Sequence, residues 1–125
     1  MSTAMRRALV FALLFAPAIL AAEKAAEKAS VTGEVVDSAC WIKSGAKGES
    51  HRTCAQQCAD AGIPLAVVED GTNKLVWLYS VDDMETPTKQ LRPFAGRKVT
   101  VTGTWAERGG AKILLVDKIT PAAAP

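Results

Sequence analysis

Hydrophobic and polar residues alternate most regularly in the last third of the chain. In the segment Lys98–Trp105, Val99, Val101 and Trp105 fall on one side and threonines occupy the other. This period of two residues is typical of a β-strand with one buried face. A Gly-Gly pair separates this segment from a second apolar one, Ala111–Ile119, so we expect the two to form a hairpin.

Three more segments have the composition of strands. Val31–Asp37 is rich in β-branched residues and is predicted to be the first strand, with Gly33 at a bulge or bend. Leu65–Glu69 and Leu75–Tyr79 are short apolar runs on either side of an Asp-Gly pair, which is a strong hairpin pattern. The chain therefore has five predicted strands.

One segment between the first and second strands has the pattern of a helix. His51–Ala61 is rich in helix-forming residues, and Ser50 can cap its start. Gly62 suits the left-handed position after the helix, and Pro64 prevents its extension. The polar, glycine-rich segment Lys43–Ser50 is predicted to be a loop.

The order of these elements predicts a mainly β fold. A short helix fits between Pro87 and Pro93, which places a helical link between the third and fourth strands, as in an OB-fold barrel. We expect a five-stranded, OB-like antiparallel barrel over residues 31–120, with the cysteine-bearing helix inserted between strands one and two. An SH3-like barrel or a small sandwich remains an alternative for so short a chain.

The first residues have the pattern of an export signal. Arg6 and Arg7 precede an apolar run, Ala8–Ala22, that ends in small residues. This pattern is typical of a secretory signal peptide, and the run is shorter than the ~20 residues that span a bilayer. We expect residues 1–22 to be the signal peptide, with an uncleaved anchor as the alternative. The mature protein is then periplasmic or secreted, without stable membrane insertion.

Two short segments beside the predicted domain have few apolar side chains that a core could bury. Residues 23–30 consist mainly of Ala, Glu and Lys, and residues 121–125 of Ala and Pro. We expect the first to be a flexible spacer and the second a disordered tail.

The charge of the chain narrows the range of partners. Of the 125 residues, 15 are Lys or Arg and 13 are Asp or Glu. Without Arg6 and Arg7, which lie in the predicted signal peptide, the two kinds are equal in number. Such a balance argues against a nucleic-acid-binding protein.

The three cysteines and the single histidine fall close together in the sequence, as Cys40, His51, Cys54 and Cys58. Helix residues follow one another by about 100°, so the last three lie along one stripe of the predicted helix. Cys40 follows the first strand and can fold back over that stripe. Thiolate and imidazole ligands suit zinc or copper(I), or, less well here, an iron–sulfur centre. His51 is about 10 Å from Cys58 along the helix axis. Its imidazole therefore either points toward Cys54 and binds the ion there, or makes a hydrogen bond to a residue that binds the ion.

Two other interpretations of the cysteines remain open. Small exported proteins depend on disulfides, and Cys40 bonded to Cys54 or to Cys58 would clamp the helix to the first strand and leave one thiol over. Alternatively, Cys54 lies in the first turn of the helix, where the helix dipole favours a reactive thiolate. A reactive thiolate at this position would be consistent with a thiol redox protein.

Three stretches of the chain carry a resemblance to known proteins. They are Gly-Glu-Val-Val-Asp-x-x-Cys at 33–40, His-x-x-Cys-Ala-x-x-Cys-Ala-x-x-Gly-x-Pro at 51–64, and Phe-Ala-Gly-Arg-Lys-Val-Thr-Val-Thr-Gly at 94–103. Together they resemble a group of small exported bacterial proteins with an OB-like β-barrel. The resemblance implies that Cys40, His51, Cys54 and Cys58 belong to one site, but it names neither an ion nor a reaction.

From the sequence we expect an exported protein that binds a soft or borderline metal ion through these four residues, in a structural or carrier role. Catalysis is not indicated. The alternative from another class is a disulfide-stabilised module that binds an unknown exported partner protein.

Overall fold

The computed structural model describes residues 26–82 and 86–122 of the chain. The predicted signal peptide, the start of the predicted spacer and the last three residues of the predicted tail lie outside the described residues. None of the described helices is long and apolar enough to cross a membrane.

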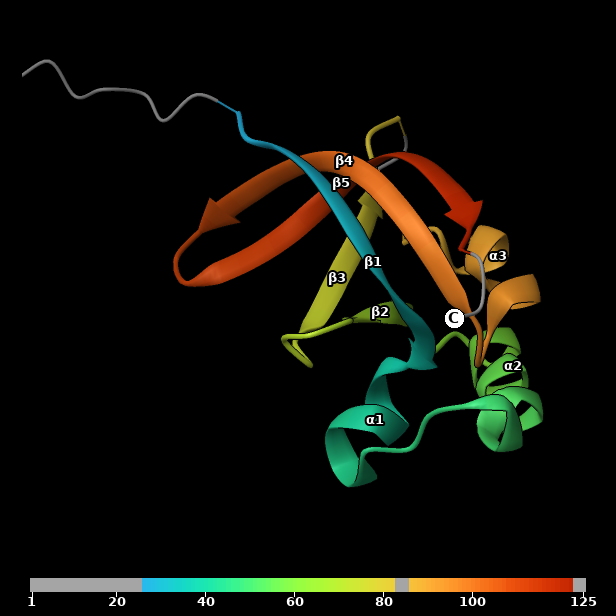
Figure 1. Ribbon diagram of the computed structural model, residues 1–125. Coiled ribbons are helices and arrows are strands. Elements are labelled where there is room, and N and C mark those ends of the chain that lie inside the picture. The colour runs from blue at the N-terminus through green and yellow to red at the C-terminus, as the bar shows by residue number, and fades with distance from the viewer. Residues whose placement is uncertain (1–25, 83–85, 123–125) are drawn as a thin grey trace, which may run out of the picture.

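The described residues form a mainly β structure with helices between the strands (Figure 1). The strands are β1 (Lys28–Asp37), β2 (Leu65–Glu69), β3 (Leu75–Ser80), β4 (Lys98–Arg108) and β5 (Ala111–Pro121). The α-helices are α1 (Ser38–Ser44), α2 (Arg52–Asp60) and α3 (Thr88–Leu91), and the two 3-10 turns are η1 (Glu49–His51) and η2 (Arg92–Phe94). All five predicted strands are therefore present, and so are the predicted helix of the 51–61 segment and the short helix after Pro87.

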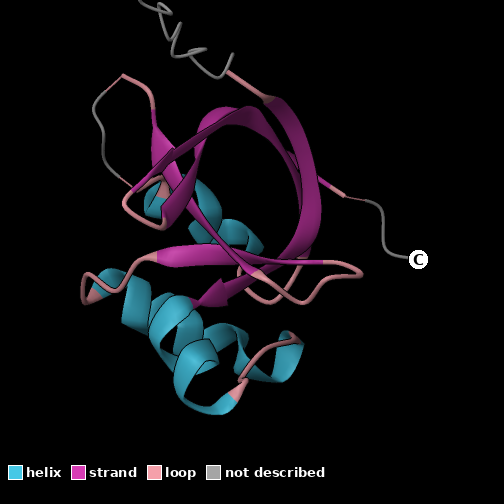
Figure 2. Cartoon of the chain, turned by 90° about the vertical axis from the view of Figure 1, so that its left-hand side faces the viewer, coloured by secondary structure: helices cyan, strands magenta, loops and turns pink. Residues whose placement is uncertain are grey.

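The sheet closes in a ring in the order β1-β2-β3-β5-β4 (Figure 2). Four of the five pairings are antiparallel, but β3 and β5 run parallel, with Trp77 opposite Ile113 and Ser80 opposite Val116. The ring is therefore antiparallel, as predicted, in every pairing but one. The reason is geometric, because strand directions cannot alternate all the way around a ring with an odd number of strands.

The core lies inside this ring. Val99 and Val101 are fully buried, as their alternation with threonines predicts. Trp105 is only partly buried and packs against the core cluster. Its ring is also covered by Lys112, whose Nζ lies 4.3 Å from the ring centroid.

Gly33 on β1 lies close to the backbone of β2. A Cβ at this position would be 2.1 Å from the backbone oxygen of Val68 on β2. The registers of β1 with both of its neighbours run through Gly33 without a shift, so the predicted bulge is absent. Glycine is needed here because the backbone of β2 occupies the space of a side chain.

Both ends of the domain extend beyond their predicted limits. Lys28, Ala29 and Ser30 pair with β4 as the first residues of β1, so the prediction of a flexible spacer is wrong for them. Pro121 is the last residue of β5 and is not part of a disordered tail. In both cases the long strand β4 supplies backbone hydrogen bonds that residues with few apolar side chains can use.

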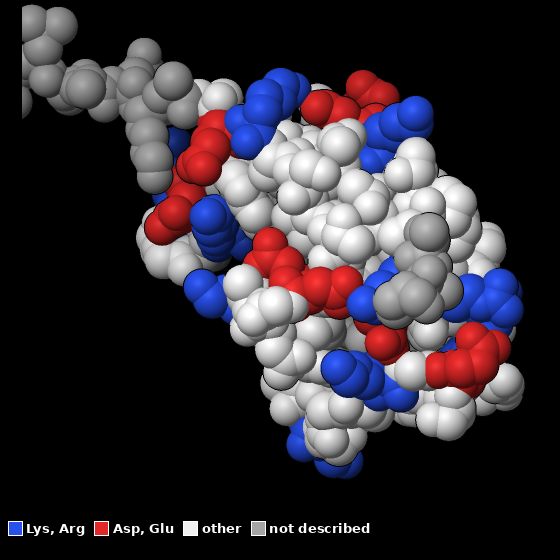
Figure 3. Space-filling view, viewed as in Figure 1, with Lys and Arg blue, Asp and Glu red and all other residues white. Residues whose placement is uncertain are grey.

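Charged side chains are interspersed on the molecular surface. On the face drawn in Figure 3, acidic and basic residues alternate without a large area of either sign. Exposed ion pairs also occur, such as that between Lys28 on β1 and Asp117 on β5, at 2.9 Å.

Candidate metal centre

Cys40 lies on a helix that the sequence patterns did not predict. Asp37 ends β1 and caps α1, because its Oδ1 accepts hydrogen bonds from the backbone N–H groups of Ala39 (2.8 Å) and Cys40 (3.1 Å). The helix ends at Gly45, whose φ is 69° and whose N–H donates to the carbonyl of Trp41 at 2.7 Å. Cys40 is thereby held in the first turn of α1, directly after the first strand.

The helix α2 carries Cys54 and Cys58 and begins differently from the prediction. Ser50 and His51 belong to the 3-10 turn η1, and no side chain caps α2, so the predicted Ser50 cap is wrong. The end of the helix is as predicted. Gly62 has a φ of 97° and donates its N–H to Ala59 O at 3.0 Å, while the N–H of Ile63 reaches back to Cys58 O at 2.9 Å. These two bonds form a Schellman motif.

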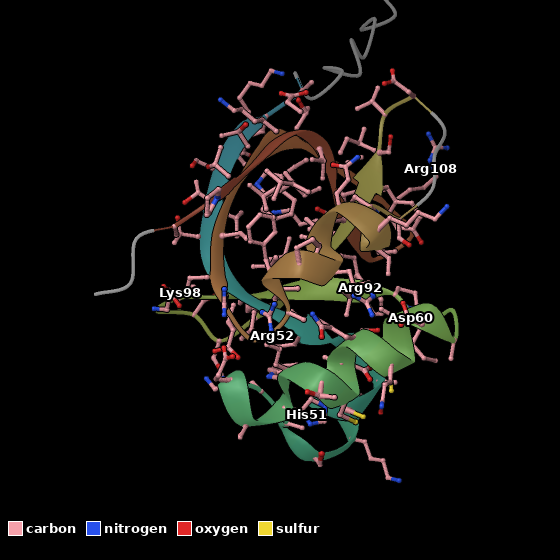
Figure 4. The ribbon with its side chains drawn as sticks, turned by 90° about the vertical axis from the view of Figure 1, so that its right-hand side faces the viewer. His51, Arg52, Asp60, Arg92, Lys98 and Arg108 are labelled. Carbon is pink, nitrogen blue, oxygen red and sulfur yellow. The ribbon has the colours of Figure 1, made fainter. Side chains whose placement is uncertain are left out.

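Contacts at both ends of α2 fix it against the link between β3 and β4 (Figure 4). The guanidinium of Arg52 donates to the carbonyls of Ala95 and Pro93, both at 2.8 Å. At the other end of the helix, Arg92 makes two hydrogen bonds to the carboxylate of Asp60, at 2.6 and 2.8 Å.

The side of α2 that carries the cysteines faces away from the ring. Ala55 is the buried residue of α2 and belongs to the core cluster. Cys54 is exposed, and Cys58 is half-buried. Figure 4 shows His51 on the side of α2 remote from the ring, next to α1. The sulfur atoms therefore meet between the two helices and not in the core.

The structure brings the four predicted residues together around Cys40. One group consists of Cys40, His51 and Cys54, whose donor atoms all lie within 4.8 Å of one another. A second group consists of Asp37, Cys40 and Cys58, within the same limit. Cys58 does not join the first group, because it lies one helical turn, about 6 Å, farther along α2 than Cys54.

The sequence patterns missed Asp37. Its side chain is fully buried, although it belongs to the cluster of sulfur atoms. Among the described residues, neither Oδ2 of Asp37 nor Nε2 of His51 has a hydrogen-bond partner, and both atoms are inaccessible to solvent. The one available signal was an Asp at the end of a strand and three residues before Cys40, which is a helix-capping arrangement.

The Asp37 carboxylate determines the electrostatics of the cluster. Burial acts to raise the pKa of Asp37, but the nearby thiols of Cys58 and Cys40 and the capping N–H groups stabilise the charged form and lower its pKa overall. The same carboxylate, together with burial, raises the pKa of Cys40 and raises the pKa of Cys58 to about 12. Without a cation these two groups are therefore thiols at neutral pH.

All three cysteines are free. The Sγ atom of Cys40 lies within 4.8 Å of Sγ of Cys54 and of Sγ of Cys58. Both disulfide pairings considered from the sequence therefore remain possible with small side-chain movements.

In comparisons with protein-family models, with curated proteins and with solved structures, nothing matches this chain. The geometry of the site is accordingly the basis for a functional proposal.

Proposed function

We propose that this chain is an exported, OB-like protein that binds a soft or borderline metal ion through Cys40, His51 and Cys54, with Cys58 at the same site. The observation that carries the proposal is the grouping of three thiols and the only imidazole between α1 and α2. The ring order and the helical link between β3 and β4 support the OB-like class. The N-terminal pattern of Arg6, Arg7 and a short apolar run supports export to the periplasm or outside the cell.

The chemistry of the donors fits zinc or copper(I). Both ions accept sulfur and imidazole ligands, and the buried, unpartnered Nε2 of His51 is an atom that needs a partner. Two thiolates on one tetrahedral zinc lie about 3.8 Å apart, which follows from Zn–S bonds of about 2.3 Å. The donor atoms of the first group are all within 4.8 Å, so small rotations about side-chain bonds bring them to that distance.

The location of the site suggests two roles. An ion held by Cys40 on α1 and by His51 and Cys54 beside α2 would tie the two helices together, which is a structural role. Cys54 is exposed, so a ligand from solvent or from a partner protein can reach the ion. That access also allows the protein to carry the ion and deliver it.

Elemental analysis together with thiol counting tests the proposal. The protein is isolated from the exported compartment without chelators. We expect it to contain at least about one metal ion per chain. Cys40→Ser should lose most of the metal, and Cys54→Ser and His51→Gln should each bind less metal than the wild type. Gln57→Ser, on an exposed position of the same helix, should retain it. Absence of metal from protein whose three thiols are all free would overturn the proposal.

The alternative of a disulfide-stabilised interaction module is favoured by two observations. Cys40 is within reach of two other sulfur atoms, and Ile42 on the same helix is an apolar residue with 62% exposure. One blocked pair of cysteines, one free thiol and no metal would support this alternative. Reversible oxidation of the pair by a physiological oxidant would instead support a thiol redox protein.

A further inference from the structure

The cluster contains more donors than one ion uses. Its five candidate ligands divide into two groups of three that share Cys40, namely Cys40, His51 and Cys54 on one side and Asp37, Cys40 and Cys58 on the other. Within each group the donor atoms lie close enough for one ion, and no set of four does. In this arrangement of the side chains a single ion can therefore engage only one group at a time.

Asp37 has a free oxygen in the second group. The carboxylate uses Oδ1 to cap α1, whereas the inaccessible Oδ2 has no hydrogen-bond partner among the described residues. None of the ion pairs in the described part of the chain involves Asp37. A buried carboxylate without a cation or a full set of hydrogen bonds is costly, and a metal ion beside Cys58 would supply the missing partner.

The charges of the donors indicate how many cations the cluster can take. When the three thiols have lost their protons, they and Asp37 carry four negative charges, and neutral His51 adds none. One divalent cation leaves two of these charges uncompensated beside a fully buried side chain, whereas two divalent cations balance them. Two copper(I) ions would also leave two negative charges uncompensated. The charge balance therefore favours a divalent ion such as zinc.

We infer that the site is binuclear. One divalent ion is held by Cys40, His51 and Cys54, a second by Asp37, Cys40 and Cys58, and the Cys40 thiolate bridges the two. This inference rests on the proposed metal-binding function and adds the number of ions, the bridging residue and a ligand, Asp37, that the sequence patterns did not reveal. Three protein donors per ion leave one position on each for water or for a ligand from a partner protein.

Titration of the reduced, metal-free protein with Zn²⁺ and, separately, with Co²⁺ tests the inference. We expect binding to level off at two equivalents per chain. With Co²⁺, the sulfur-to-metal charge-transfer absorption should grow over both equivalents. The electron paramagnetic resonance signal should weaken with the second, because a bridging thiolate couples the two ions magnetically.

Variants assign each ion to its ligands. Asp37→Asn keeps a capping oxygen but removes the charge, and Cys58→Ser changes a half-buried position on α2. Each should reduce the stoichiometry from two ions to one. His51→Gln should also leave one ion, held by Asp37, Cys40 and Cys58. Cys40→Ser should weaken the binding of both ions by at least tenfold. Far-UV circular dichroism shows whether each variant is folded, and Gln57→Ser serves as the matched control that binds two.

The outcomes separate this inference from the proposed function. Two equivalents in the wild type, reduced to one by both Asp37→Asn and Cys58→Ser, support the binuclear site. One equivalent in the wild type overturns it and leaves the proposed function intact, and no binding overturns both. Two equivalents that persist in both variants would show that Asp37 and Cys58 are not ligands, which also overturns the inference.

Discussion

The three cysteine side chains have different surroundings, and these predict different reactivities. Cys54 is exposed, whereas Cys40 and Cys58 are half-buried and lie against the Asp37 carboxylate. The thiolate is the reactive form of cysteine, and the negative charge of Asp37 opposes its formation. A residue that contributes one oxygen to a helix cap therefore also controls the chemistry of two thiols.

Alkylation of the metal-free protein with iodoacetamide should modify Cys54 first and Cys58 last. The neighbouring Asp37 carboxylate and burial raise the pKa of Cys58 to about 12, so only a small fraction is thiolate at pH 7 to 8. Its rate should rise about tenfold with each unit of pH toward that value. Mass spectrometry of peptides after timed quenching gives the three rates.

Asp37→Asn is the control for this electrostatic effect. Without the negative charge the pKa of Cys58 should fall, and its alkylation at pH 8 should become faster by tenfold or more. Equal rates for Cys58 in the wild type and the variant would show that the carboxylate does not control this thiol.

The elements of the fold differ in how well the sequence predicts them. The strands β4 and β5 and the helix α2 are clear from the sequence. Their signals, the alternation of apolar and polar residues and the Gly62 and Pro64 that end the helix, are local patterns. The helix α1 has only seven residues, without a regular apolar spacing, and Asp37 caps its start. The burial of Asp37 and its contact with Cys58 join residues from β1 and α2, so no local pattern contains them. A parallel pairing, in contrast, could have been predicted from an odd number of strands in a closed ring, although not that it joins β3 and β5.

The attachment of α2 depends on Arg52. Its guanidinium donates to two carbonyls at 2.8 Å, those of Ala95 and Pro93, and the side chain is only 22% exposed. Hydrogen bonds from a charged donor contribute about 1.5–3 kcal/mol each. We therefore expect Arg52→Ala to lower the free energy of unfolding by about 3 kcal/mol and Arg52→Lys, which cannot form the fork, by about 1–2 kcal/mol.

Urea unfolding of the metal-free protein measures these changes. Lys43→Ala is the control, since Lys43 is exposed on α1, and such surface changes alter stability by about 0.5 kcal/mol or less. A loss for Arg52→Ala no greater than the control's would contradict the proposed attachment of α2.

The pair Asp60–Arg92 should make stability depend on pH. The hydrogen bond to Arg92 lowers the pKa of Asp60 in the folded protein. The carboxylate form is thus favoured by folding, and the stabilisation is fully present above the ordinary pKa of Asp, about 3.9. It is lost as the pH falls through the lower folded-state value.

Melting temperatures of metal-free wild type and Asp60→Asn, measured from pH 7 to pH 2, test this sign. Wild type should melt higher at neutral pH, and the difference should shrink below about pH 4. Because both side chains are partly exposed, 0.5 M salt should also reduce it. Arg92→Gln should abolish the effect of Asp60→Asn, and a difference that does not change with pH would rule out the charge interaction as its source.

For the whole molecule, the position of the proposed metal site between α1 and α2 would link metal binding to folding. Both helices are inserted between β1 and β2, and α2 is attached to the rest of the domain through Ala55, Arg52 and the Asp60–Arg92 pair. A domain of this size buries a modest core, so an ion that holds the insertion contributes a large share of the stability. An ion at 100 times its Kd adds about 2.7 kcal/mol if only the folded state binds it.

Zinc should therefore raise the melting temperature of the reduced protein by about 10 °C or more, since 1 kcal/mol corresponds to about 4–8 °C in a domain of this size. A chelator should reverse the rise, and Cys40→Ser should abolish it, because Cys40 belongs to both donor groups. The oxidised wild type, with Cys40 in a disulfide, should melt high without zinc and respond weakly to it, because the same sulfur cannot serve the disulfide and the ion as a thiolate. If the oxidised and reduced proteins gain equally from zinc, the ion binds elsewhere, and Cys40 is not the residue that couples the two helices.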